Sequence, residues 1–120
     1  MLEFIYYTRQ NQTINVKVSE NTYERLAVVG LAKAVTYTEH KLMIEDEEYE
    51  VNAAELNYDS RTKFLLIIET ERQKELEKLF ANMDVNPTIK EVRENFDYVK
   101  TLTEMYKLFK NEDYLYFSYE

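Results

Sequence analysis

The chain has no cysteine and no tryptophan, and it has only one glycine, one proline and one histidine in 120 residues. Without cysteine it can form neither disulfides nor thiolate metal sites, and thiol redox chemistry is excluded. With Gly30 as the sole glycine, neither a phosphate-cradling loop nor a dinucleotide-binding motif can be written. These absences remove several large classes of enzyme.

Other catalytic and metal-binding chemistry also has little support. The single histidine, His40, lies in a turn-like stretch, and only Ser19, Ser60 and Ser118 could act as a histidine-activated nucleophile. The acidic run that follows lacks the spacing and the sharp-turn glycine of a calcium-binding loop. Two carboxylates brought together by the fold for acid–base work stay open as an alternative. We predict no enzymatic activity, no catalytic residue, no metal site and no cofactor.

Length and composition predict a single domain over residues 1–120. Hydrophobic residues make up 45% and charged residues 32% of the chain, which is typical of a globular protein. No apolar run approaches the roughly 20 residues that span a bilayer. The start, residues 1–4, lacks the basic and apolar regions of a signal peptide. We expect a soluble, cytoplasmic protein with no membrane partner.

Alternating apolar residues predict an N-terminal β-hairpin. Residues 2–8 are rich in strand formers, and residues 13–19 alternate strictly between apolar and polar side chains. A helix is predicted from about residue 21 to residue 33, begun by a capping box from Asn21 to Glu24. A short helix followed by a buried strand at 27–31 is the alternative.

A second hairpin is predicted around the most acidic part of the chain. Its strands would be residues 41–44 and 49–52, with Ile44 paired to Tyr49. The residues between lack the Asn-Gly or Asp-Gly pair of a tight primed turn, so we predict a four-residue loop from Glu45 to Glu48.

Three further strands are predicted in the middle of the chain. They are residues 35–38, 55–58 and 63–69, with a turn before the last one. The run from residue 63 to residue 69 is continuously apolar at its centre, which is typical of a central strand buried on both faces.

The C-terminal half is predicted to be mainly helical. Capping boxes begin helices at about 71–83 and 88–110, separated by a break at Asn86-Pro87, and residues 114–119 form a last strand. The second helix could be interrupted near Asn95. The apolar stripe of the first is Leu76, Leu79, Phe80 and Met83. Together these elements predict an α+β fold with a mainly antiparallel sheet, packed by helices at 21–33, 71–83 and 88–110.

The negative charge is concentrated in one segment. The chain's formal net charge is -8, and residues 45–59 hold seven carboxylates and no basic residue. We consider three interpretations: protection of an exposed sheet edge, a docking site for a basic protein surface, and mimicry of a nucleic acid. Mimicry fits least, because the charges lie within a few residues of one turn. The partner-binding candidates are Glu45, Asp46, Glu47, Glu48 and Glu50.

The 11 tyrosines suggest a second surface. Tyr49, Tyr58 and Tyr106 fall on predicted inner faces and are assigned to the core. Adjacent or alternating tyrosines on the terminal strands must place some rings on an outer face, where they could stack on unpaired bases or anchor an interface. The candidates for this aromatic or nucleic-acid surface are Tyr6, Tyr7, Arg9, Tyr114, Tyr116 and Tyr119.

Residue usage predicts an AT-rich genome, because Phe, Tyr, Met, Ile, Asn and Lys total 46 while Gly, Ala, Arg and Pro total 13. In length, composition and mixed order of strands and helices, the chain resembles small accessory proteins of plasmids and phages in low-GC bacteria. These include conjugation regulators of the PrgU type, whose PUA-like fold binds RNA, and counter-defence inhibitors.

We therefore expect a small regulatory or adaptor protein, encoded by a mobile element, that binds a partner protein with a basic surface. One alternative is a regulator that binds RNA or single-stranded nucleic acid, which the negative net charge disfavours. Another is an acidic inhibitor of a nucleic-acid-binding host protein. Self-association into a homo-oligomer stays open.

Overall fold

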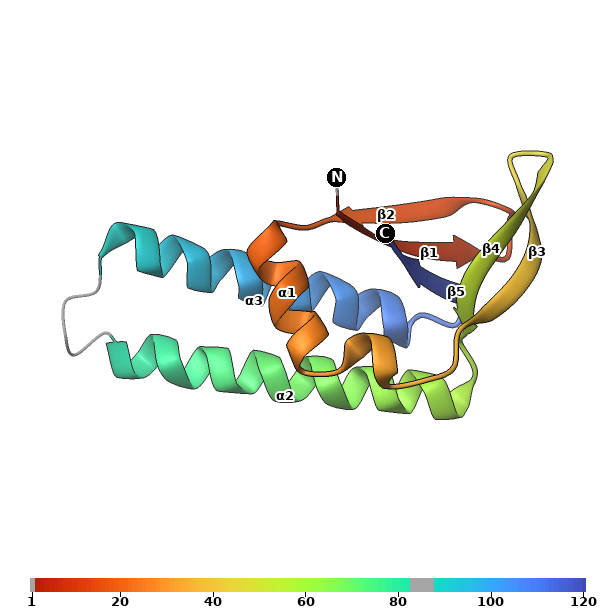
Figure 1. Ribbon diagram of the computed structural model, residues 1–120. Helices are drawn as coiled ribbons and strands as arrows, with labels where there is room; N and C mark the ends of the chain where they lie inside the picture. The colour runs from red at the N-terminus through yellow and green to blue at the C-terminus, as the bar shows by residue number, and fades with distance from the viewer. Residues whose placement is uncertain (1, 83–87) are drawn as a thin grey trace.

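The computed structural model describes residues 2–82 and 88–120. A five-stranded antiparallel sheet has the strand order β2-β1-β5-β4-β3 (Figure 1). Its strands are β1 (Glu3–Thr8), β2 (Thr13–Lys17), β3 (Thr38–Ile44), β4 (Glu47–Glu55) and β5 (Tyr114–Tyr119). The last strand of the chain therefore lies at the centre of the sheet, between the first hairpin and the second.

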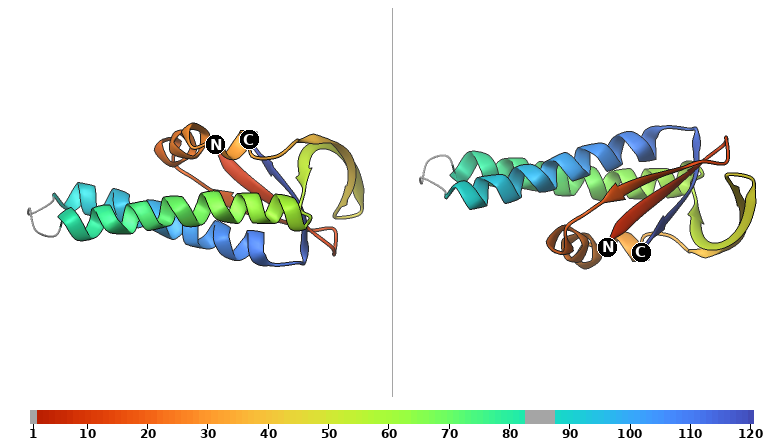
Figure 2. Two further views of the ribbon diagram at one scale, coloured as in Figure 1. Left: turned by 90° about the horizontal axis from the view of Figure 1, so that it is seen from below. Right: turned by 90° about the horizontal axis from the view of Figure 1, so that it is seen from above.

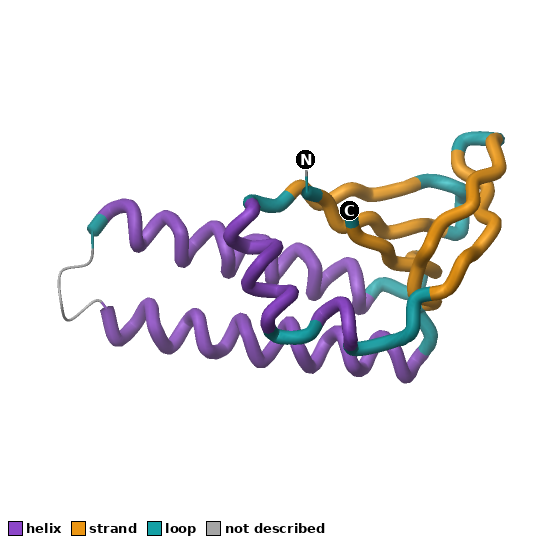
Figure 3. Tube along the Cα trace, in the orientation of Figure 1, coloured by secondary structure: helices purple, strands orange, loops and turns teal. Residues whose placement is uncertain are grey.

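Two long helices cover one face of this sheet. The helices are α1 (Glu20–Val28), the short 3-10 helix η1 (Leu31–Lys33), α2 (Tyr58–Asn82) and α3 (Ile89–Lys110). Figure 2 shows α2 and α3 side by side along one face of the sheet and continuing past it, and Figure 1 shows that α1 crosses them near their middle. The strands gather at one end of the molecule, as Figure 3 shows by colour.

Aromatic side chains fill the space between the sheet and the helices. The ring of Phe117 in β5 lies 5.1 Å from Tyr6, 5.2 Å from Phe64 and 4.9 Å from Phe109. All four side chains are fully buried. Each such pair contributes about 0.5–1.5 kcal/mol beyond the area that it buries. The central strand is thus also the centre of the core.

The predicted α+β fold class is confirmed, together with both hairpins and the C-terminal strand. The capping box at the start of α3 is also confirmed. The Thr88 hydroxyl accepts a hydrogen bond from the Glu91 N–H at 3.2 Å, and the Glu91 carboxylate accepts one from the Thr88 N–H at 3.3 Å. The helix then continues without interruption at Asn95. The predicted break at Asn86-Pro87 lies outside the described residues.

The predicted strands at 55–58 and 63–69 are wrong, because α2 begins at Tyr58 and not near residue 71. The cap is a reciprocal pair: the Ser60 N–H donates to Asn57 Oδ1 at 2.9 Å, and the Asn57 N–H donates to Ser60 Oγ at 3.0 Å. Phe64 and Ile68 are four residues apart and both fully buried, so the apolar run packs one helical face.

The first helix also differs from its prediction. Its N-cap is Ser19, whose hydroxyl accepts from the Thr22 N–H at 3.2 Å, and not Asn21. It ends at Val28, because Gly30 adopts a left-handed backbone with φ of 91° that stops the helix. Neither the helix to residue 33 nor the alternative strand at 27–31 forms.

Two further predictions fail in the middle of the chain. The predicted strand at 35–38 is a loop, and only its last residue begins β3. On α2, Leu79 is buried, but Phe80 is 66% exposed and Glu71 and Glu75 are buried instead. The buried residues of α2 recur every three or four positions from Phe64 onward, and this spacing places both glutamates on the buried face of the helix. Met83, the last member of the predicted stripe, lies outside the described residues.

Candidate docking hairpin

The β3–β4 hairpin turns through two residues and not through the predicted four. Ile44 pairs with Glu47, and Glu45 and Asp46 form the turn with φ values of 50° and 68°. Left-handed backbone at both positions defines a type I′ turn, which matches the twist of the strands. The pairing is shifted by two residues, so Ile44 and Tyr49 still share a face although they are not directly paired.

The five carboxylates at this turn are all exposed. We name Glu45, Asp46, Glu47, Glu48 and Glu50 the acidic tip. Within residues 2–82 and 88–120, no lysine or arginine forms an ion pair with any of them. The Tyr49 hydroxyl donates a 2.6 Å hydrogen bond to Glu47 Oε2, and this bond to a carboxylate raises the pKa of the tyrosine. The tip therefore presents five carboxylates to solvent, and no ion pair among the described residues neutralises them.

The acidic tip is attached to the first hairpin. The Glu45 N–H donates to the Asn11 carbonyl oxygen at 3.0 Å, which joins the two turns. β4 pairs with β5 only at Ala54 and Glu55, so the rest of the hairpin bends over the outer face of the sheet. There Leu42, Ile44 and Val51 pack against Ile5, Tyr7 and Ala53. These contacts hold the tip in place.

A cleft of about 300 Å³ lies between the two hairpins. Ile5 and Tyr7 are buried in its floor, while Glu47 and Tyr49 are exposed at its mouth. The full lining is Ile5, Tyr7, Thr13, Asn15, Ile44, Glu45, Glu47 and Tyr49. The cleft thus combines an apolar floor with carboxylates at its opening.

The predicted seven-carboxylate segment divides into two parts in space. Glu55 lies at the end of β4, where it pairs with Tyr116 of β5, and Asp59 lies in the first turn of α2. Asp59 Oδ2 is 3.1 Å from Lys63 Nζ. Only five of the seven carboxylates therefore lie at the tip of the hairpin.

The structure buries the two N-terminal tyrosines of the proposed aromatic surface. Tyr6 is fully buried against the helices, and burial raises its pKa. Tyr7 points to the opposite face, where its hydroxyl lies 2.8 Å from Ser118 Oγ; burial raises its pKa although that hydrogen bond opposes the shift. The second hairpin covers the outer face of the sheet, so Tyr7 is buried there and neither ring is exposed.

The other members of that surface are divided between the two faces of the sheet. Arg9 is exposed in the first turn, where its Nη2 donates to the Glu112 carbonyl oxygen at 3.4 Å. Tyr114 and Tyr119 lie toward the helix side, near Tyr6 and Tyr23. Tyr116 lies on the outer face with its ring 4.6 Å from His40. The six residues do not form one exposed surface.

Two tyrosines assigned to the core are exposed. Tyr58 is 88% exposed because it is the first residue of α2, and Tyr49 is 46% exposed at the mouth of the cleft. Tyr106 is half-buried under Arg72, whose guanidinium lies 4.9 Å from the ring centre. The residue at which α2 begins determines the exposure of Tyr58, and the register of the β3–β4 hairpin determines that of Tyr49.

A buried polar cluster joins α1 to the long helices. Arg25 Nη2 lies 2.5 Å from Glu75 Oε2, and its guanidinium lies 3.7 Å above the ring of Tyr98. The Tyr98 hydroxyl donates to Glu71 at 3.3 Å; burial first, then the Glu71 charge, raises the pKa of Tyr98. Burial lowers the pKa of Arg25, but the bond and charge of Glu75 outweigh it and leave a net rise. These contacts attach α1 to α2 through Glu75 and to α3 through Tyr98.

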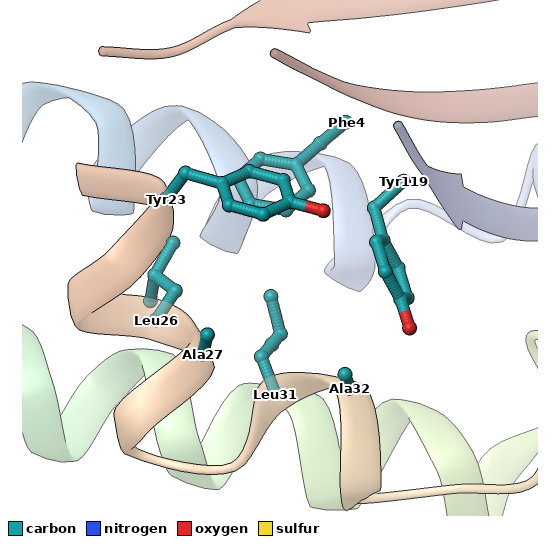
Figure 4. A pocket seen from close by; sticks show the side chains of 7 residues that line it. All are labelled: Phe4, Tyr23, Leu26, Ala27, Leu31, Ala32 and Tyr119. Atoms are coloured by element: carbon teal, nitrogen blue, oxygen red, sulfur yellow. The ribbon is translucent and has the colours of Figure 1, made fainter. Parts of the chain in front are cut away.

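A second, smaller pocket lies between α1 and the sheet (Figure 4). It measures about 90 Å³ and has no charged side chain in its lining. The lining residues are Phe4, Tyr23, Leu26, Ala27, Leu31, Ala32 and Tyr119. The pocket is well below the roughly 300–1,000 Å³ of ligand sites, so it fits no more than a small apolar group.

In the described part of the chain, no three histidine or carboxylate side chains gather to hold a metal ion. Nor do those residues include a helix long and apolar enough to cross a membrane. Comparisons with models of protein families, with curated proteins and with solved structures found no match for this chain.

Proposed function

We propose that this protein is a non-enzymatic regulatory or adaptor protein that binds a basic surface of a partner protein through its acidic tip. The main observation is the left-handed backbone at Glu45 and Asp46. This conformation costs about 1–2 kcal/mol at a residue such as Glu45 and less at aspartate, and Asn-Gly is the preferred pair for such a turn. Strained backbone is typical of functional sites.

The charge of these residues gives a reason for the strain. Asn-Gly would form the turn more easily but would remove two carboxylates from the tip. Five exposed carboxylates that form no ion pair in the described part of the chain produce a local negative field, which accelerates encounter with a basic surface and helps to align it. The bond between Glu45 and Asn11 holds this field at a fixed place.

Edge protection is the competing explanation, and charge reversal separates it from docking. Lysine protects a sheet edge as well as glutamate does. Replacing Glu47 and Glu48 with lysine therefore keeps that protection while it repels a basic partner. Any loss of partner binding in the reversed protein is then caused by the sign of the charge.

We expect Glu47→Lys/Glu48→Lys to reduce capture of the partner by about tenfold or more. The assay is an affinity pull-down from a low-GC bacterial lysate, with and without nuclease, at low and high salt. The matched control is Glu94→Lys/Asp97→Lys, which changes the net charge equally on the exposed surface of α3.

A partner lost from the first variant, kept by the control and insensitive to nuclease supports the proposal. Equal capture by both variants contradicts it. Capture that nuclease abolishes also contradicts it, because the bound species is then a nucleic acid and the alternative of an RNA-binding regulator takes its place.

A further inference from the structure

We propose that the cleft between the two hairpins receives an arginine side chain of the partner protein. This inference rests on the docking function proposed above and specifies the chemistry of its central contact. It is based on the shape and lining of the cleft, and not on the number of carboxylates at the tip.

The cleft matches the two parts of an arginine side chain. Ile5 and Tyr7 are 8% and 7% exposed and, with Ile44, give an apolar floor for the aliphatic stem. Glu45 and Glu47 line the opening, where the guanidinium would lie. A volume of about 300 Å³ is at the small end for ligand sites, which suits one side chain better than a larger molecule.

The groups at the mouth favour guanidinium over ammonium. Glu47 is already oriented by the 2.6 Å hydrogen bond from Tyr49, and its remaining lone pairs are free to accept. A planar guanidinium has five donors, so it can bridge Glu47 and Glu45 while it stacks on the exposed Tyr49 ring. Lysine offers a point charge that is more strongly hydrated, and an apolar side chain leaves both carboxylates without a partner.

The hairpin itself supplies a matched control. Glu47 pairs with Ile44 on the face that lines the cleft, whereas Glu48 pairs with Met43 on the opposite face. The two glutamates are adjacent in sequence and both exposed. A neutral glutamine at either position makes the same change in net charge, but only Glu47→Gln changes the cleft.

The test uses N-acetyl-arginine methylamide, followed by NMR chemical-shift titration of the full chain. We expect shifts at Ile5, Ile44 and Tyr49, and weaker binding by about threefold to fivefold in Glu47→Gln. Glu48→Gln should change the affinity by less than about 1.5-fold, because a charge on the far face is screened by solvent. The citrulline analogue, with the same stem and no charge, should not bind.

Three results would overturn the inference: equal effects of the two glutamine variants, shifts outside the cleft, or a lysine or citrulline analogue that binds as well as arginine. The failure of the docking function is distinguishable from these. If charge reversal weakens partner capture but arginine misses the cleft, the acidic tip docks the partner without this socket. If charge reversal leaves partner capture unchanged, the docking function is wrong. Binding of the arginine derivative in the cleft would then identify only a ligand site.

Discussion

At the scale of the residue, the hydroxyl group of Tyr6 is expected to lower the free energy of unfolding. Its hydroxyl is buried, and among the described residues it has no hydrogen-bond partner. An unpartnered buried polar group costs about 1–3 kcal/mol. We expect Tyr6→Phe to raise the free energy of unfolding by about 1 kcal/mol, measured by urea denaturation.

Tyr7→Phe is the matched control on the same strand. Its hydroxyl is paired with Ser118 Oγ at 2.8 Å, so the substitution leaves a buried serine without that partner. It should lower the free energy of unfolding by about 1 kcal/mol. Equal losses for both variants would show that the Tyr6 hydroxyl is satisfied in solution.

Arg61 holds the junction between α2, α3 and β5. Its guanidinium donates to the carbonyl oxygens of Leu56, Phe109, Asn111 and Tyr114. Partial burial lowers its pKa.

A lysine cannot span these acceptors, so Arg61→Lys should lower the free energy of unfolding by about 2–4 kcal/mol. Thermal and urea unfolding measure the change, and Arg93→Lys on the exposed face of α3 should stay within about 0.5 kcal/mol. A similar small effect at Arg61 would mean that its hydrogen bonds are exchanged for water without loss.

At the scale of the element, we expect changes that stabilise the turn of the acidic hairpin to weaken the binding of the partner. Glu45→Asn/Asp46→Gly provides the preferred type I′ pair, so it should stabilise the protein by about 1–2 kcal/mol. The same change removes two carboxylates and should weaken partner capture. Thermal unfolding and the pull-down measure the two effects.

Asn11→Gly is the control for this prediction, because Asn11 is also left-handed, with φ of 60°, in the neighbouring turn. It should relieve a smaller strain and leave capture unchanged. A destabilised Asn-Gly variant would show that the tip is not strained. Unchanged capture would remove the link between the strain and docking.

Elements marked by adjacent residues could be predicted from the sequence. Thr88 and Glu91 begin α3 by contacts within one turn, and the alternation of residues 13–19 is a local pattern. The start of α2 was missed because its cap joins Asn57 to Ser60 and not to an acidic residue. The apolar run after it fits either a buried strand or a helix by periodicity alone.

The candidate site was predicted in part. Its carboxylates are visible as a charge run, but the cleft beside them depends on contacts between two hairpins whose turns lie more than 30 residues apart in the chain, such as the bond from Glu45 to Asn11. The same holds for the ion pair between Arg25 and Glu75, which are 50 residues apart. Contacts between residues so far apart in sequence follow from the tertiary fold, so no local sequence pattern predicts them.

At the scale of the whole molecule, buried tyrosines predict sensitivity to alkali. Burial raises the pKa of Tyr6, Tyr7, Tyr37 and Tyr98 above the ordinary value. The unfolded chain therefore loses these protons first, near pH 10. Their contribution to stability is complete below about pH 10 and is lost as the pH rises toward the folded-state values.

For the fully buried Tyr6 the loss is about 1.4 kcal/mol per pH unit above that point, and it is smaller for the partly solvated rings. Urea denaturation from about pH 8 to about pH 11.5, with tyrosinate absorbance, measures it. Tyr6→Phe should show a shallower decline. If the free energy of unfolding declines identically in both proteins, a group other than Tyr6 causes the loss of stability.

The central position of β5 has a consequence for how the chain folds. β1 pairs with β5 across more than 100 residues, and β4 meets the same strand from the other side. During synthesis the first hairpin, the acidic hairpin and the helical pair can each form from local contacts, but they stay unconnected as a sheet until residues 114–119 emerge. Pairing across so large a sequence separation slows folding, so we expect the sheet to be completed only when this last strand enters it.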